Sequence, residues 1–316
     1  MNLFVLILSA QLLYYLLIAQ TGIVGAFNSD IHNLYTLPLG GITGGLLAAF
    51  TAHKHIKIQL YIMFFSQFIL SFFYPHYSLI EIFILGFVVG YTAPLLFFIF
   101  ETQERIGLAI GLCLSYVIGT IFYTYPFDQR GIIAFVLSSV SIIALWFLDI
   151  KSQKDIFTKV DFKIILILIL WIFADSTLFE TLSRSNDMDI WSKYTLYIII
   201  FHIIGVIAAY KYPINVVTKN NIILPLFILS YILFAIKIPI LLAIIYPFTI
   251  SYYNFSLFSY IIKLNNIRYI AFSMIAIGWL ATSMANAVAL EKQLWVAYTI
   301  LALSSATFLI LNRRKI

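Results

Sequence analysis

Two carboxylates lie inside one of the apolar stretches of this chain. Asp175 falls near the middle of the run 163–183, and Glu180 follows closer to its end. A charged side chain at the centre of a bilayer costs about 2.5–3.5 kcal/mol on insertion scales, and such residues usually serve ion, proton or ligand pathways. Asp175 is therefore the first candidate for a group that binds and releases a proton or pairs with a cation. A structural pairing with a neighbouring helix is the alternative.

The residues that follow Asp175 form a polar face. Ser176, Thr177 and Glu180 share one side of a helix with Arg184, which stands at i+4 from Glu180. Asp175 points almost opposite to the middle of this face. Either the helix is broken here, or Asp175 faces protein while the polar face lines a pathway. A simple ion pair at a helix end is the other interpretation of Glu180 and Arg184.

Other apolar runs carry isolated polar groups. Tyrosine hydroxyls can bind polar groups while their rings pack, and histidine can relay protons. The candidates are Gln11, Tyr14 and Tyr15 in the first run, Tyr91 in the fourth, His202 in the eighth, and Tyr246, Thr249, Tyr253 and Asn254 in the tenth. Because the chain has 21 tyrosines, ordinary packing is the alternative for the tyrosines. A hydrogen-bonded core histidine is the alternative for His202.

The composition decides what kind of solvent surrounds these groups. Hydrophobic residues make up 63% of 316 positions and charged residues 10%, whereas soluble domains are about a quarter charged. Lipid must therefore surround most of the chain. The net charge of +6 does not indicate nucleic acid, because the basic residues stand between apolar runs as topology determinants do. Cys113 is the single cysteine, so we expect no disulfide, no thiol metal site and no cofactor.

Apolar stretches long enough to cross a hydrocarbon core recur between short polar breaks. They predict an all-α polytopic membrane protein with about 12 transmembrane helices, and ten or eleven remain alternatives. The first run has no basic residue before it and no clear cleavage site, which favours a retained helix over a signal peptide. The expected spans are 3–25, 34–52, 57–74, 79–100, 106–125, 131–149, 163–183, 192–210, 221–236, 239–261, 268–288 and 293–312.

The longest polar interruption falls near the midpoint of the chain. It predicts an N-terminal six-helix bundle over 1–149, a cytoplasmic linker over 150–162 and a C-terminal six-helix bundle over 163–316. Most Lys and Arg residues fall in breaks on the linker's side, which places both termini in the cytoplasm. The excess of Lys over Arg and the abundance of Ile and Asn favour a bacterial inner membrane.

Two segments resemble the major facilitator superfamily of transporters. In the break between the second and third spans, that family has a glycine, an aspartate four residues on, a second glycine and paired basic residues. This chain has Gly45, then Ala49 and Ala52 at the aspartate and second glycine positions, and a basic end from His53 to Lys57. The small residues allow close helix approach, but the charge that pairs with a neighbouring loop is missing.

The second resembling segment is the entry to the fifth span, where the family has small residues at a spacing of four. This chain has Glu104, Arg105, Gly107, Gly111, Ser115 and Gly119 there, and Arg268, Ala271, Ser273, Ala276 and Gly278 at the corresponding place half the chain later. Such repetition is what duplicated halves require. The resemblance implies that helices one, four, seven and ten line a central cavity, so that the polar residues of those spans face the substrate.

These observations favour a secondary active transporter of a small solute that works by alternating access, coupled to protons or another ion. We expect a monomer in membrane lipid, with no nucleic-acid partner and no enzymatic activity. A membrane-embedded enzyme acting on a lipid-linked substrate is the first alternative. The second is a ten-helix drug/metabolite-type exporter, which would suit the length. The sequence contains no Gly-rich phosphate loop, paired histidine ligands or serine elbow.

Overall fold

A computed structural model describes residues 3–24, 31–51, 55–100, 105–150, 160–185, 187–213 and 215–313. Every regular element in these ranges is a helix. Most of the expected linker, residues 151–159, lies outside the described residues. So do four positions of the two resembling segments, Ala52, His53, Lys54 and Glu104.

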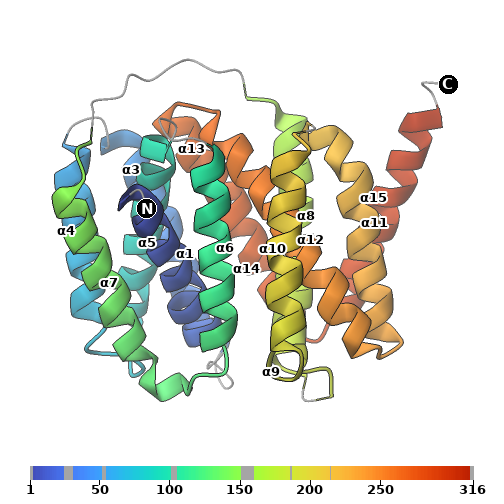
Figure 1. The fold of residues 1–316 in the computed structure, drawn as a ribbon, viewed down its shortest axis with the longest axis horizontal. Coiled ribbons are helices and arrows are strands. Elements are labelled where there is room, and N and C mark those ends of the chain that lie inside the picture. Colours follow the sequence, from blue (N-terminus) through green and yellow to red (C-terminus); the bar gives the residue numbers. More distant parts are fainter. Residues whose placement is uncertain are drawn as a thin grey trace.

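The first half of the chain forms one group of helices, seen on the left in Figure 1. Its first helix begins as α1 and continues without a break as the π-helical segment η1. The elements are α1 (Leu3–Tyr14), η1 (Tyr15–Val24), α2 (Ile31–Leu34), α3 (Thr36–Thr51), α4 (Ile56–Leu70), α5 (Leu79–Phe100), α6 (Arg105–Phe122), η2 (Phe127–Gln129) and α7 (Arg130–Phe147).

The second half begins at α8, whose first turn is capped by Asp161, a side chain that accepts from the backbone N–H of Lys163 at 2.9 Å. Helices α8, α10, α11, α12 and α15 lie on the right in Figure 1, while α13 and α14 lie towards the middle. The elements are α8 (Phe162–Ser183), α9 (Ile190–Lys193), α10 (Thr195–Lys211), α11 (Val216–Ala235), α12 (Pro239–Ile262), α13 (Ile267–Met274), η3 (Ile275–Ala281), α14 (Thr282–Leu290) and α15 (Leu294–Arg313).

The lengths of the helices identify an integral membrane protein. Within the described residues, 8 helical stretches are long and apolar enough to cross a bilayer. Four shorter apolar helices, Thr36–Thr51, Ile56–Leu70, Thr195–Lys211 and Leu294–Ala306, fall where four more spans were expected. The count of twelve spans stays a prediction.

Glycines hold α3 directly against α5. A Cβ at Gly40 would lie 2.1 Å from the carbonyl oxygen of Phe83, and one at Gly86 would lie 2.0 Å from that of Leu37. Gly44 and Gly90 show the same closeness, with 2.1 Å to a backbone oxygen of the facing helix. Helices in lipid associate through such close backbone packing, which explains why the second span is rich in glycine.

The small residues of the fifth span also make a helix interface, against α1 and its continuation η1. A Cβ at Gly111 would lie 3.2 Å from the Leu8 side chain, and one at Gly119 would lie 2.7 Å from Leu16. The corresponding position in the second half differs, because a Cβ at Gly278 would meet nothing within 4 Å. The two halves therefore use their small residues in different ways.

The two halves of the chain touch at both ends of α6. At the beginning of α6, the Arg105 guanidinium lies over the rings of Tyr210 and Phe255, 5.8 and 5.6 Å from their centroids. After the end of α6, the rings of Tyr123 and Trp191 lie 5.3 Å apart. The space between these contacts is where a site enclosed by both halves can form.

Candidate functional site

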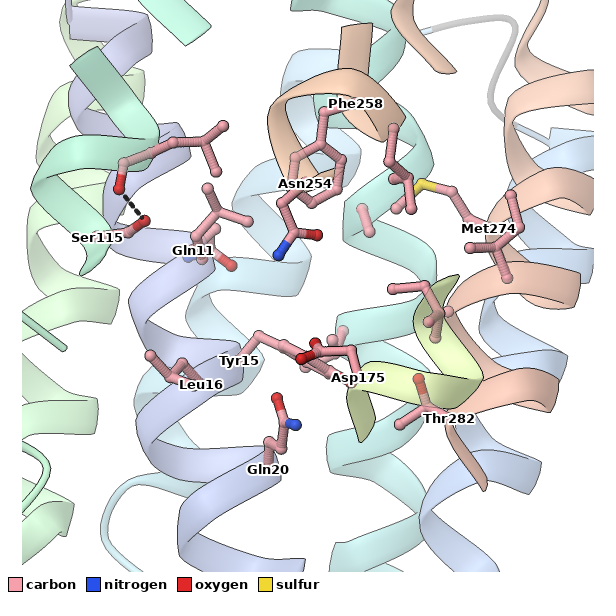
Figure 2. Close-up of a pocket in the computed structure, with 18 of the residues that line it drawn as sticks. Gln11, Tyr15, Leu16, Gln20, Ser115, Asp175, Asn254, Phe258, Met274 and Thr282 are labelled. Atoms are coloured by element: carbon pink, nitrogen blue, oxygen red, sulfur yellow. Dashed lines mark hydrogen bonds between the residues drawn. The ribbon is translucent and has the colours of Figure 1, made fainter. Parts of the chain in front are cut away.

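A cavity of about 250 Å³ lies between the two halves. Residues of α1, η1, α3, α5 and α6 line it from the first half, and residues of α8, α9, α10, α12, α13, η3 and α14 line it from the second (Figure 2). Its polar and aromatic lining includes Gln11, Tyr15, Gln20, Thr92, Ser115, Tyr116, Tyr123, Asp175, Ser176, Trp191, His202, Tyr253, Asn254, Trp279 and Thr282.

Helix α8 turns Asp175 towards this cavity. The lining residues of α8 are Ile172, Asp175, Ser176 and Phe179, a spacing that defines one face of a helix. Helix α8 runs unbroken from Phe162 to Ser183. The expectation that Asp175 faces protein, or that the helix breaks beside it, is wrong. The cavity-facing side of α8 is mostly apolar, and for this reason the polar pattern alone pointed to another face.

Two tyrosines of α12 hold the Asp175 carboxylate. Tyr246 donates its hydroxyl to Oδ1 at 2.7 Å, and Tyr253 donates to Oδ2. The Tyr246 hydroxyl also lies 2.9 Å from the backbone oxygen of Asp175, and Tyr231 of α11 donates to the backbone oxygen of Ala174 at 2.8 Å. Tyr253 lines the cavity, whereas Tyr246 is fully buried behind it. These bonds fix the carboxylate in one position.

Glu180 and Thr177 lie away from the cavity. Glu180 is 2% exposed and accepts from Nε of Arg184 at 2.5 Å, and Nη2 of Arg184 donates to the backbone oxygen of Val24 at 2.9 Å. Thr177 donates to the backbone oxygen of Phe173 at 2.8 Å. Neither residue is part of the lining. The predicted face is therefore divided: Ser176 lines the cavity, whereas Glu180 is neutralised locally by Arg184 and the Thr177 hydroxyl bonds to its own helix.

A second polar group surrounds His202. Its Nδ1 shares a hydrogen bond of 2.5 Å with Ser251 of α12, and its ring stacks on Tyr116 of α6 at 4.3 Å between centroids. Asn254 donates from Nδ2 to the Tyr116 hydroxyl at 2.8 Å. This chain of contacts joins α6 to α10 and α12 along the cavity wall. The hydrogen bond of His202 leads to Ser251 rather than to Asp175, so the histidine is not the direct partner of the carboxylate.

The first helix contributes Gln11 and Tyr15 to the lining, but not Tyr14. The Gln11 amide exchanges hydrogen bonds of 3.0 and 2.9 Å with Gln67 of α4 and also donates to Ser141 of α7 at 2.9 Å. Gln11 thus fastens three helices together at the cavity wall. Tyr14 is fully buried outside the lining.

Two more candidates lie outside the lining. Tyr91 shares a hydrogen bond of 2.9 Å with Thr51 of α3, and Thr249 donates to the backbone oxygen of Ile245 at 2.7 Å. Neither belongs to the residues that line the cavity. Their described contacts serve helix packing, which is the alternative interpretation that the sequence left open for the tyrosines.

Sequence reasoning missed the two π-helical segments. Segment η1 carries Tyr15 and Gln20, η3 carries Gly278 and Trp279, and all four residues line the cavity. The rings of Tyr15 and Trp279 meet edge to face, 6.4 Å apart, across the two halves. Widened turns of this kind occur frequently at functional sites. No residue pattern in these apolar runs distinguishes them from an α-helix.

Tyrosine and tryptophan also close the cavity near the end of α6. Tyr123 and Trp191 line the cavity there, in contact with each other.

Together the fold and the cavity define a class of membrane protein with two helical halves around a largely apolar cavity that holds a few polar side chains. Solved structures with this arrangement are a D-xylose-proton symporter (14% identity, TM-score 0.62, 96% of this chain and 95% of the other) and the human organic anion transporter MFSD10 (12% identity, TM-score 0.65, 98% and 96%). A major facilitator proton:xylose symporter bound to 6-bromo-6-deoxy-D-glucose also matches, with a TM-score of 0.51 and 12% identity over 98% of this chain and 89% of the other.

The chain therefore has the major facilitator superfamily fold, as the two sequence segments predicted. The alternative of a ten-helix drug/metabolite-type architecture is not the fold observed. No family model and no curated protein matches the sequence.

Proposed function

We propose that this protein is a secondary active transporter of a small solute, working by alternating access and coupled to protons or another ion. The observation that carries the proposal is Asp175, a carboxylate held by two tyrosines at mid-length of an apolar helix and turned into a cavity that both halves enclose. Such a residue is costly in a membrane and is usually retained for a pathway.

The proposed mechanism uses the two halves as the moving parts. Residues 1–149 and 163–316 act as six-helix bundles that rock about the cavity, with both termini in the cytoplasm of a bacterial inner membrane. Contacts between the halves at both ends of α6 support a cycle in which one end opens while the other stays closed. Asp175 is the proposed coupling residue, so Asp175→Asn should remove the effect of the ion gradient on solute uptake.

The cavity's exposure can be tested without knowing the solute. Cys113 is the single cysteine, so a Cys113→Ser background can carry one new cysteine at Ser176, which lines the cavity. We expect a membrane-impermeant thiol reagent to modify Ser176→Cys when it is added to either face of oriented proteoliposomes. Reaction from one face alone would show a one-sided cavity and would contradict alternating access.

Thr177→Cys in the same background provides the matched control. Thr177 follows Ser176 directly and is 0% exposed against 4% for Ser176, but unlike Ser176 it lies outside the lining. It should resist the reagent from both faces. A lipid-product assay on the purified protein addresses the alternative of an enzyme acting on a lipid-linked substrate.

A further inference from the structure

The cavity carries a single formal charge, and it is negative. Among the described residues that line it, Asp175 is the one carboxylate, and none is Lys or Arg. The partners of the carboxylate in the described structure are neutral hydroxyls of Tyr246 and Tyr253. A charge removed from water is costly unless it is paired. A solute that brings a positive charge into this cavity would supply that pairing.

Acceptors for such a solute remain available. A carboxylate has about four acceptor sites, and the two tyrosines of α12 use one on each oxygen of Asp175. Asn254 also lines the cavity, and because its Nδ2 donates to Tyr116, the end not used by that bond is the acceptor Oδ1. Asn254 and Asp175 lie around the same space in Figure 2. Asp175 therefore offers free acceptor sites to a group that carries several N–H donors, and Asn254 offers a further acceptor elsewhere on the lining.

Most of the remaining lining is aromatic or apolar, beside a minority of polar side chains such as Gln20, Ser115 and Ser176. It includes the rings of Tyr15, Tyr116, Phe179, Trp191, Tyr253 and Trp279. Aromatic faces attract a cation within about 6 Å of the ring centroid, most strongly where water is excluded. They also bury apolar surface of a ligand. A carboxylate together with aromatic walls therefore selects for charge and for an apolar body at the same time.

We propose that the solute is an organic cation: an ammonium group that pairs with Asp175, attached to an aromatic or aliphatic body that packs on the ring-lined walls. This assignment rests on the proposed transport function and adds the chemical class of its substrate. It separates this cavity from one built for anions, which needs a cationic side chain, and the binding test below includes a sugar.

Three matched probes test the assignment. Phenethylamine, 2-phenylethanol and 3-phenylpropionate share a phenylethyl body and differ in carrying a positive, zero or negative charge at neutral pH. Trp191 and Trp279 line the cavity, so binding can be followed by tryptophan fluorescence and by calorimetry on the purified full-length protein. We expect the amine to bind at least about tenfold more tightly than either analogue, with D-xylose as a neutral polyol for comparison.

The Asp175→Asn variant tests the origin of this preference. Removing one partner of a buried charge pair typically costs enough to weaken binding by roughly 30-fold or more. Asp187→Asn removes an exposed carboxylate, 80% accessible in its side chain, and should leave the amine affinity unchanged. The comparison of the three probes on the unaltered protein needs no variant to fold.

The outcomes separate this inference from the transport proposal. Equal or tighter binding of 2-phenylethanol, 3-phenylpropionate or D-xylose, or binding of none of the probes, would overturn the organic-cation assignment. An amine affinity that Asp175→Asn leaves unchanged would do the same. None of these results affects the thiol labelling of Ser176→Cys, which tests the transport proposal independently.

Discussion

Helix α8 holds two carboxylates in opposite situations. Glu180 is buried beside Arg184, which neutralises it and reaches across to the backbone of Val24 in the other half. Asp175, little more than one turn earlier, has two neutral hydroxyl donors and faces the cavity. A carboxylate that is paired with a neighbouring cationic side chain, as Glu180 is, has a structural role. One that has only neutral donors is left to take its counter-charge from a ligand or a proton.

This comparison predicts its largest effect on stability at Arg184. Arg184→Leu would leave Glu180, which is 2% exposed, without its cation. Breaking a buried pair in this way typically costs about 3 kcal/mol or more in unfolding free energy. Because Arg184 is itself 24% exposed, we expect a loss at the lower end of that range, measured by detergent-titrated unfolding.

Asp187→Asn serves as the control for Arg184→Leu. The Asp187 carboxylate lies 3.7 Å from the amine of Lys237, but the two side chains are 80% and 71% exposed. Exposed pairs contribute little to stability, so this variant should unfold like the unaltered protein. An Arg184→Leu protein as stable as the control would remove the structural role assigned to Glu180.

We expect an intermediate loss of unfolding free energy when the hydrogen-bonded amides of Gln11 and Gln67 in the first half are separated. Gln67 is 0% exposed, and Gln67→Leu would remove both hydrogen bonds that Gln11 exchanges with Gln67, while the bond from Gln11 to Ser141 stays. An unsatisfied buried polar group costs about 1–3 kcal/mol, and measured inter-helix hydrogen bonds in membranes lie near or below the lower figure. We therefore expect a loss of about 1 kcal/mol in unfolding free energy.

The double variant sharpens the prediction for Gln67. If the two amides depend on each other, Gln11→Leu with Gln67→Leu should be less destabilised than the sum of the single variants, because no orphaned amide remains. Additive losses would show that the two side chains do not couple. The Gln11–Gln67 pair would then not stabilise the fold in the way that its hydrogen bonds indicate.

Most of the fold, but only part of the site, could be predicted from the sequence. Apolar length and the small residues at Gly45 and Gly107 led to the superfamily fold, because span length and close helix packing depend on local composition. Asp175 could be recognised as a candidate because burying a charge in an apolar run is costly, and this argument does not require knowing which residues contact it. The face of α8 that meets the cavity is set by the packing of α1, α6 and α12, which the sequence of α8 does not reveal. Tyr116 and Trp191 were missed because the apolar runs that contain them have the same composition as the other runs.

The smallest predicted effect on stability is the one at Asp175. Asparagine has the shape of aspartate, keeps one acceptor for a tyrosine hydroxyl and offers its amide N–H to the oxygen of the other tyrosine. It also removes a charge whose described partners are neutral hydroxyls. We expect Asp175→Asn to change the unfolding free energy by less than Gln67→Leu does, measured as for Arg184→Leu. A loss as large as that of Arg184→Leu would mean that Asp175, like Glu180, is part of the framework. If Asp175→Asn leaves the unfolding free energy unchanged and removes binding of the amine, the Asp175 carboxylate serves ligand binding and not the stability of the fold.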